Sequence, residues 1–204
     1  GEINFCFAIT EATAGTNSIK INTLARANGN RFSMSGSKTF ITGADVCDYA
    51  LVVARTTPHG EVKRKTDGFT LFIVDLNAKG VERHPIDINL PIPESQFTIF
   101  FDEVDLGLEN VIGEVGRGFD ILFDSLNPER ILVAALCCGI GRFALEKAVA
   151  YASEREVFDV PIGSHQGVQH PLAAAKTQVE MASLMMRQAA WQYDQGLPAG
   201  EASN

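Results

Sequence analysis

Two segments of this chain place hydroxyl groups and a glycine at the end of an apolar stretch, where they could bind a ligand. The first covers residues 8–17 and contains Thr10, Gly15 and Thr16, and the second covers residues 38–43. A glycine lets the backbone approach a ligand closely, while N–H and O–H groups can donate hydrogen bonds to polar ring edges or phosphate oxygens. An ordinary Ser/Thr/Gly turn has the same composition, so the pattern alone leaves both interpretations open.

Glu129 is the residue in the second half of the chain that could act as a base. Apolar residues follow it on one helical face, and a carboxylate desolvated there binds a proton more strongly, as proton abstraction requires. A glutamate at the second position of a helix also complements the helix dipole, and this simpler alternative stays open. The apolar residues on that face are Leu132, Val133, Leu136, Ile140 and Phe143.

Other familiar motifs are absent from the sequence or indicate packing. Residues 139–144, Gly-Ile-Gly-Arg-Phe-Ala, fit a dinucleotide-binding fingerprint, but that site needs a strand, a tight turn and a helix start. These glycines fall inside a helical pattern, so close helix packing explains them better. The four histidines have no metal-ligand spacing, and the sequence has neither a nucleophile elbow nor a phosphate-binding P-loop. A metal site is therefore not expected.

The residues before about 107 are predicted to form short strands. β-Branched and aromatic runs alternate with turn residues such as Asn-Gly-Asn at 28–30 and Asp-Gly at 67–68. Because no helical pattern separates these runs, the strands are expected to pair antiparallel, as a β-barrel or a two-sheet sandwich. The predicted strands cover residues 3–10, 19–27, 31–42, 49–55, 69–75, 80–86 and 97–101.

From residue 118 the apolar period becomes helical. Asn127 and Pro128 read as a helix cap followed by proline at the first helical position, which predicts a helix from 128 to about 156. A second helix is expected over about 168–195. Each helix has an apolar stripe that a two-helix hairpin cannot cover on both sides, so two long antiparallel helices of a four-helix bundle are predicted.

The predicted fold class is therefore α+β. A β domain is expected at residues 1–112 and a partial helical-bundle domain at 113–204. The chain begins inside a strand pattern without a methionine and ends soon after a helical pattern, so it is expected to be a fragment of a longer protein.

The composition is that of a globular protein. The 204 residues are 46% apolar and 21% charged, and the formal net charge is −8. General disorder is excluded, and an acidic chain is not expected to bind nucleic acid or an anionic membrane surface. Four cysteines are too few for a disulfide scaffold and indicate a reducing compartment. A cytoplasmic location is expected, or the mitochondrial matrix if the source is eukaryotic.

Taken in order along the chain, these motifs resemble the acyl-CoA dehydrogenase family. The resemblance covers nearly the whole chain, and several spaced motifs in order are more specific than any one of them. The matching segments are Thr-Glu at 10–11, Ala-Gly-Thr-Asn at 14–17, Phe-Ile-Thr-Gly at 40–43, Phe-Asp-Glu-Val at 101–104, Asn-Val-Ile-Gly at 110–113, Gly-Phe at 118–119, Glu-Arg-Glu-Val-Phe at 154–158 and Ile-Gly-Ser-His-Gln at 162–166.

The resemblance implies a flavoprotein that dehydrogenates acyl-CoA thioesters. In this family a carboxylate removes the α-proton, the β-hydrogen passes as hydride to N5 of FAD, and the product is a trans-2-enoyl-CoA. A dry site suits this chemistry, because hydrogen bonds that stabilise enolate-like charge are strongest where water is excluded. The family subunit has an N-terminal helical domain, a middle β domain and a C-terminal four-helix bundle. This chain resembles the middle domain with the first two bundle helices.

The resemblance also implies which residues bind the cofactor. A strand that lies along the flavin ends at Thr10, whose position hydrogen-bonds to the ring, and the position of Thr16 holds pyrophosphate or substrate. Three positions in the helical part reach the FAD of a neighbouring subunit, so a homotetramer or homodimer is implied. The implied FAD-binding residues are Phe7, Ile9, Thr10, Gly15, Thr16, Phe40, Ile41 and Thr42 from the β part, with Arg155, Phe158 and Gln166 from the helical part.

The implied catalytic base depends on the branch of the family. Most members carry the base in the last third of their chain, whereas the isovaleryl and long-chain types carry it in a Glu-Arg pair on a bundle helix. Glu129 and Arg130 resemble that pair, so Glu129 is expected to be the base and Arg130 to lie near the acyl-CoA substrate. Electrons are then expected to leave to an electron-transferring flavoprotein.

Two other functions stay open at this point. An acyl-CoA oxidase or flavin monooxygenase of the same fold would reoxidise its flavin directly with oxygen. A non-catalytic β module with a helical dimerisation hairpin would bind no FAD.

Overall fold

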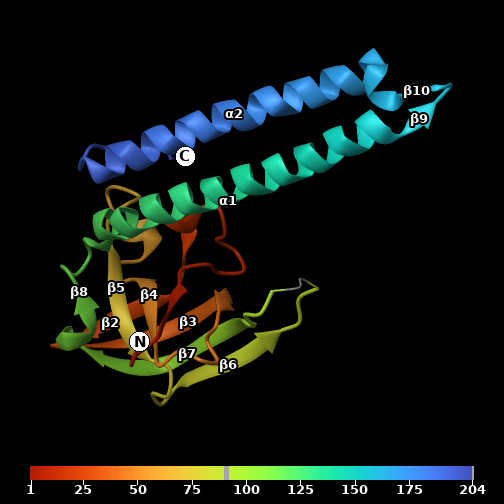
Figure 1. Ribbon diagram of the computed structural model, residues 1–204. Helices are drawn as coiled ribbons and strands as arrows, with labels where there is room; N and C mark the ends of the chain where they lie inside the picture. The colour runs from red at the N-terminus through yellow and green to blue at the C-terminus, as the bar shows by residue number, and fades with distance from the viewer. Residues whose placement is uncertain (90–91, 204) are drawn as a thin grey trace. The chain divides into compact units, whose positions relative to one another are not determined.

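The chain divides into a β unit and a helical unit. The computed structural model describes residues 1–89 and 92–203, and the two units are Gly1–Leu122 and Phe123–Asn204 (Figure 1). A sheet followed by two long helices confirms the predicted α+β class.

The described residues of the β unit form one mixed sheet of eight strands. Its strand order is β6-β7-β3-β2-β4-β5-β8, and β1 pairs with β4 outside this path. Strands β3, β4 and β5 begin and end at the predicted residues. The strands are β1 (Phe5–Ala8), β2 (Leu24–Asn28), β3 (Arg31–Thr42), β4 (Tyr49–Arg55), β5 (Phe69–Asp75), β6 (Val81–Ile86), β7 (Gln96–Gly107) and β8 (Val111–Ile112).

The expected antiparallel pairing needs correction at two strand pairs. β1 runs parallel to β4 from Phe5↔Tyr49 to Ala8↔Val52, and β2 runs parallel to β4 at Leu24↔Arg55. Parallel strands need a long crossover; the β2–β3 hairpin supplies it between β1 and β4, and β3 supplies it between β2 and β4, without an α-helix. Of the two expected architectures, a closed barrel is not found, since no pairing within residues 1–89 and 92–203 joins the edge strands β6 and β8.

The core of the β unit is formed by the side chains that point inward at alternate positions along its strands. Phe32 and Met34 of β3 are buried, and the Phe32 ring meets the edge of the Phe72 ring with centroids 5.3 Å apart. β4 and β5 each have a paired strand on both sides and are buried along most of their length. Their apolar runs therefore need no polar face.

Two bulges interrupt the pairing of β3 with β7. The register shifts between Met34 and Gly36, and again between Lys38 and Ile41. Gly36 has φ +147° at the first bulge, a conformation nearly restricted to glycine. The second bulge moves the inward positions of β3 from even to odd residue numbers, because Lys38 and Ile41 are both buried. Phe40, between them, is exposed.

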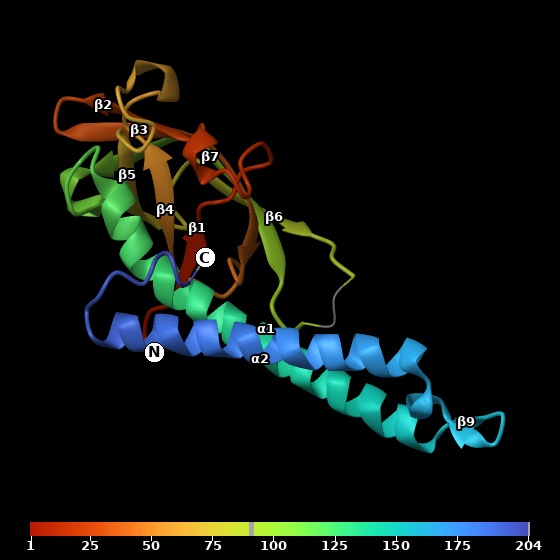
Figure 2. The same cartoon turned by 90° about the horizontal axis from the view of Figure 1, so that it is seen from above.

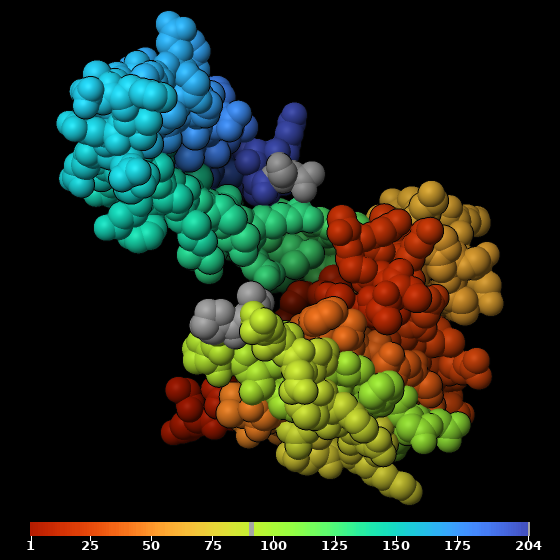
Figure 3. Space-filling view, turned by 90° about the vertical axis from the view of Figure 1, so that its right-hand side faces the viewer, coloured from red at the N-terminus to blue at the C-terminus, as the bar shows by residue number. Residues whose placement is uncertain are grey.

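The helical unit contains two long antiparallel helices, as predicted. They are α1 (Gly118–Glu154), whose first turn belongs to the β unit, and α2 (Gln166–Asp194). The helices lie side by side in two views (Figures 1 and 2), and their side chains pack together in the space-filling view (Figure 3). Arg142 Nη2 donates a hydrogen bond of 2.6 Å to Ser183 Oγ across the pair. In the described ranges, no helix combines the length and apolar character needed to cross a bilayer.

Four 3₁₀ helices and a short hairpin complete the described elements. The hairpin joins α1 to α2 and consists of β9 (Glu156–Val157) and β10 (Val160–Pro161). The 3₁₀ helices are Ser18–Lys20, His59–Glu61, Leu108–Asn110 and Ile162–Ser164.

The predicted helix start at Asn127 and Pro128 is wrong. α1 begins at Gly118 and runs for 37 residues, with Pro128 inside it. Proline lacks an N–H, so it removes one hydrogen bond of the helix, but here the turns on either side keep the helix continuous. Asn127 does not act as a cap: its buried Oδ1 has no hydrogen-bond partner among the described residues. Glu129 consequently lies in the helix interior and not in its first turn.

The bulge at Gly36 predicts a large effect of a small substitution. A methyl group there would lie 2.7 Å from Thr23 Cα and from its Oγ1, in addition to the unfavourable φ. Gly36→Ala is expected to lower the free energy of unfolding by about 1–3 kcal/mol from backbone strain alone. Urea unfolding measures this change. Gly60→Ala is the matched control, because a methyl group there meets nothing within 4 Å; equal stability loss in both variants would contradict the prediction.

Candidate functional site

The two hydroxyl-bearing segments lie next to each other in the structure. The segment after β1 is held to β3 by a hydrogen bond of 2.9 Å from the Thr39 N–H to the Thr10 carbonyl. It then turns back on itself, because the backbones of Glu11 and Ala14 exchange two hydrogen bonds of 3.2 and 3.0 Å. The structure therefore brings Thr10 beside the second segment, at Thr39.

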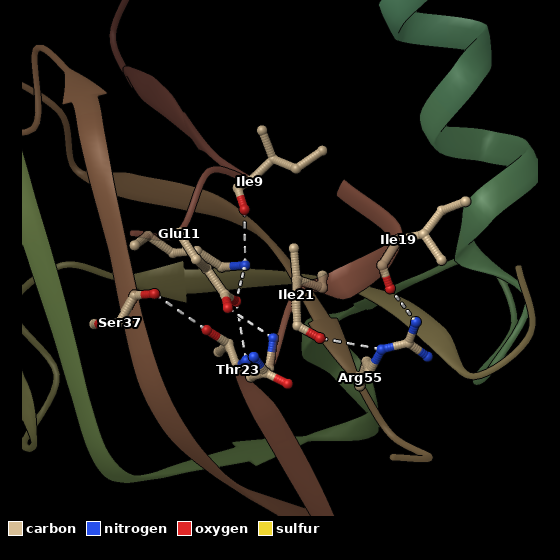
Figure 4. Close-up of polar contacts among 9 residues, drawn as sticks. Ile9, Glu11, Ile19, Ile21, Thr23, Ser37 and Arg55 are labelled. Atoms are coloured by element: carbon tan, nitrogen blue, oxygen red, sulfur yellow. Dashed lines mark hydrogen bonds and ion pairs between the residues drawn. The ribbon is translucent and has the colours of Figure 1, made fainter. Parts of the chain in front are cut away.

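A buried ion pair lies at the start of this loop. Lys38 Nζ is 2.8 Å from Glu11 Oε1, and the two side chains are 0% and 7% exposed. The same ammonium donates a hydrogen bond of 2.9 Å to the Ile9 carbonyl. The Glu11 carboxylate also accepts hydrogen bonds from the N–H groups of Asn22, at 2.6 Å, and Thr23, at 2.9 Å (Figure 4). One charge pair thus joins the end of β1, the approach to β2 and the middle of β3.

Burial and pairing move the two pKa values differently. Burial lowers the pKa of Lys38 from 10.5 to about 8, and the Glu11 carboxylate offsets part of this effect. For Glu11, burial by itself raises the pKa, but Lys38 and the N–H groups of Asn22 and Thr23 together bring it below 4.5. Both groups are therefore mainly charged at neutral pH.

A second buried cation holds the far end of the same loop. Arg55 of β4 is 1% exposed and donates hydrogen bonds to the carbonyls of Ile19, at 2.6 Å, and Ile21, at 3.1 Å (Figure 4). It also bonds to the Asp67 carbonyl at 3.2 Å, and its guanidinium lies 4.2 Å from the centroid of the Phe69 ring. Both ends of the loop are fixed, while most of its residues from 12 to 17 are exposed.

The exposed part of this edge combines an aromatic ring with polar groups. Phe40 is 60% exposed and has φ +56°, a strained conformation that such bulky residues rarely adopt. Thr42 is exposed, and its hydroxyl lies 2.9 Å from Nε2 and 3.2 Å from Oε1 of Gln96. The bulge thus presents an aromatic face beside hydrogen-bonding groups, which suits a planar ring with polar edges.

Gly15 leaves space in front of the loop backbone. A methyl group at this position would meet nothing within 4 Å, and its φ does not lie in the region that favours glycine. The fold itself therefore does not require a glycine here. The exposed backbone and the neighbouring Thr16 hydroxyl could receive the oxygens of a phosphate group.

The other expected site residues of the β unit are more enclosed. Phe7 and Ile9 are half-buried on and just after β1. The Ile41 side chain is 1% exposed and belongs to the core, so only its backbone could face a ligand.

The structure does not bury Glu129 as expected. Glu129 is exposed, and the five apolar residues that follow it on its face are 51–71% exposed. The described residues therefore do not shield the Glu129 carboxylate from water, although the sequence pattern had led us to expect that they would. The neighbouring Arg130 is half-buried, with its guanidinium 5.1 Å from the centroid of the Phe123 ring.

The remaining expected site residues lie around the β9–β10 hairpin. Arg155 and Gln166 are exposed, and Phe158 is 88% exposed at the tip. Phe158 and Asp159 form the two-residue turn with φ values of 56° and 62°, as a type I′ turn requires. This turn holds an aromatic side chain outward.

The charged residues Glu11, Lys38 and Arg55 were not among the site residues expected from the sequence. A signal for Lys38 was available: it falls in phase with Phe32 and Met34, the inward positions of its strand. A lysine at an inward position needs a buried partner, so the alternation predicts a buried ion pair, although it does not identify Glu11.

Two family models together match most of the chain. Residues 6–104 match the model described as acyl-CoA dehydrogenase, middle domain, and residues 116–204 match the acyl-CoA dehydrogenase, C-terminal domain.

Known proteins match over nearly the full chain. Acyl-CoA dehydrogenase FadE12 of Mycobacterium tuberculosis is 44% identical, over 100% of this chain and 52% of its own length. The structure of butyryl-CoA dehydrogenase from Megasphaera elsdenii has a TM-score of 0.82 and 31% identity, covering 98% of this chain and 51% of that one. A structure described as the FAD complex of PigA has a TM-score of 0.86 and 26% identity, covering 98% and 51%. The chain thus spans about half the length of these proteins.

The lowered pKa of Glu11 predicts acid sensitivity. Its ionisation stabilises the fold fully above 4.5, and this contribution is lost as the pH falls through the lowered folded-state pKa. At neutral pH, Glu11→Gln is expected to cost about 3–5 kcal/mol, because it leaves the Lys38 ammonium buried without its counter-charge. Urea unfolding at several pH values should show this difference shrinking below pH 4.5.

Asp105→Asn provides the matched control for this titration. It removes a carboxylate from the exposed Arg31–Asp105 ion pair on the same sheet, where solvent screens the interaction. This control is expected to change stability less than Glu11→Gln does. A constant difference between the natural chain and Glu11→Gln from pH 7 to below pH 4.5 would contradict the assignment.

Proposed function

Because the chain belongs to the acyl-CoA dehydrogenase family, we propose that it forms the flavin-binding part of an enzyme that converts an acyl-CoA thioester to a trans-2-enoyl-CoA. The observation that carries the proposal is the polar edge where Thr10 is bonded to Thr39, the residue before the exposed Phe40, within a chain matched end to end by FadE12. The activity is proposed for the complete natural protein, since the matched relatives are about twice as long.

The residues of this edge fit FAD. Bound FAD would supply a hydride acceptor for the β-hydrogen. Phe40 offers an exposed aromatic face to a flavin ring, and Thr10 and Thr42 offer hydrogen-bonding groups beside it. The open backbone at Gly15 and the Thr16 hydroxyl suit pyrophosphate oxygens or the substrate. Phe7, Ile9 and the backbone of Ile41 would complete this side of the site.

In the proposed reaction, Glu129 accepts the α-proton on its carboxylate and Arg130 holds the acyl-CoA. The apolar face that follows Glu129 would exclude water from the reacting carbons once it is covered in the complete protein. Covering that face would also desolvate Glu129 and so strengthen it as a base.

The proposal includes two kinds of protein partner. Arg155, Phe158 and Gln166 would contact the FAD of a neighbouring subunit in a homotetramer or homodimer, and the outward-held Phe158 supports this role. An electron-transferring flavoprotein would accept the electrons, as the family resemblance implies.

The complete protein provides the test of this function. Purified with FAD and kept free of oxygen, it should lose its visible flavin absorption when a substrate acyl-CoA is added and release an enoyl-CoA. A panel of straight and branched acyl-CoA thioesters would identify the substrate. Rapid recovery of the flavin colour in air would favour an oxidase, and absence of any bound FAD would favour the non-catalytic module.

Replacing the proposed base should abolish most of the turnover. Glu129→Gln is expected to lower kcat by roughly 10²- to 10⁴-fold, because an amide cannot accept the proton. Flavin reduction measured in a stopped-flow instrument isolates this step. Glu146→Gln on the same helix is the control and should leave the rate unchanged. Unchanged reduction in the Glu129 variant would remove Glu129 from the mechanism.

A further inference from the structure

Two cations are almost completely buried in the β unit, and both serve one loop. Lys38 on β3 is 0% exposed and Arg55 on β4 is 1% exposed. Lys38 bonds to the Ile9 carbonyl and the Glu11 carboxylate, while Arg55 bonds to the carbonyls of Ile19 and Ile21. The two cations therefore hold the two ends of a single irregular segment.

The contacts of Lys38 surround Thr10 on both sides. Its ammonium fixes the residue before Thr10 through a carbonyl and the residue after Thr10 through a carboxylate, at 2.9 and 2.8 Å. The Thr10 carbonyl itself is fixed by the Thr39 N–H, from the residue that follows Lys38. With three successive residues held in this way, the position of Thr10 depends on Lys38.

Stability alone does not account for this arrangement. A buried ion pair is weak evidence for stability, because desolvation of both charges offsets their attraction. The pair does, however, fix geometry, since charge-assisted hydrogen bonds are short and directional. The segment that it fixes leads directly into the exposed residues of the loop, 12–13 and 15–17.

We propose that Lys38, paired with Glu11, is a positioning residue for the flavin ring: it sets the place of Thr10, and through Thr10 the electronic environment of the bound cofactor. This inference rests on the proposed function. It adds two residues that do not themselves contact the cofactor but determine how the strand end meets it.

The test distinguishes the loss of the hydrogen bond between Lys38 and the Ile9 carbonyl from the effect of a buried charge left without its partner. In the complete FAD-loaded protein, Lys38→Met alone leaves the Glu11 carboxylate buried without its counter-charge. The double variant Lys38→Met with Glu11→Gln removes both charges, and its amide oxygen can still accept a hydrogen bond from the Thr23 N–H. In both variants the link to the Ile9 carbonyl is lost.

The double variant is expected to recover stability relative to Lys38→Met and yet to remain functionally impaired. Its visible flavin band should be shifted, and kcat at saturating FAD should be about 10²-fold lower, the size of effect expected from a misplacement near 1 Å. Arg31→Met, which removes the exposed cation of the same strand, should leave the band and kcat unchanged. A double variant with recovered stability and the natural band and kcat would overturn the proposal.

A titration of the natural protein decides the case if the double variant does not fold. The folded-state pKa of Lys38 is about 8, Glu11 is the charged group facing it among the described residues, and Arg55 also interacts with Glu11. A reversible shift of the flavin band as alkaline pH removes the proton of Lys38 supports the proposal, and a band that stays constant from pH 7 to the onset of alkaline unfolding overturns it. A natural protein that binds no FAD overturns the proposed function itself, a result distinct from unaffected variants of a flavoprotein.

Discussion

The buried pair of Glu11 and Lys38 is the interaction on which the candidate site depends. It joins three places that are separate in the sequence: the end of β1, the residues leading into β2, and the middle of β3. Each participating backbone group belongs to a loop that leaves the sheet and so lacks a ladder partner. The ion pair supplies the missing hydrogen bonds, and the loop can therefore stay irregular where a ligand would meet it.

The same strand also supplies the exposed face of the site. Lys38 points inward and Phe40 outward, and the bulge between Lys38 and Ile41 makes both possible without breaking the core. Without the bulge, strict alternation would place Ile41 outward, opposite to the buried position that it occupies. The bulge that keeps the side chains of Lys38 and Ile41 buried is thus also where Phe40 adopts its strained φ.

Local patterns predicted the elements well where burial dominates. β3, β4 and β5 were predicted to the residue, because turn residues bound each of these strands clearly. The parallel pairing of β1 with β4 was missed, since the sequence of one strand does not indicate which distant strand it pairs with or in which direction. The hydroxyl-bearing strand ends were found from composition, whereas the Glu11–Lys38 pair requires knowing which residues meet across the sheet.

The hydrogen-bond acceptors at the two ends of the loop explain why charged side chains, Lys38 and Arg55, hold it in place. An apolar side chain at position 38 would pack well but would leave the Ile9 carbonyl and the Glu11 carboxylate unsatisfied, and buried unsatisfied groups are costly. Arg55 meets the same need at the other end, where several carbonyls converge and a planar guanidinium with five donors can serve them together. A lysine suffices where two acceptors lie close together, and an arginine is needed where they are spread. The loop between them is held by its ends, while most of its residues from 12 to 17 stay exposed.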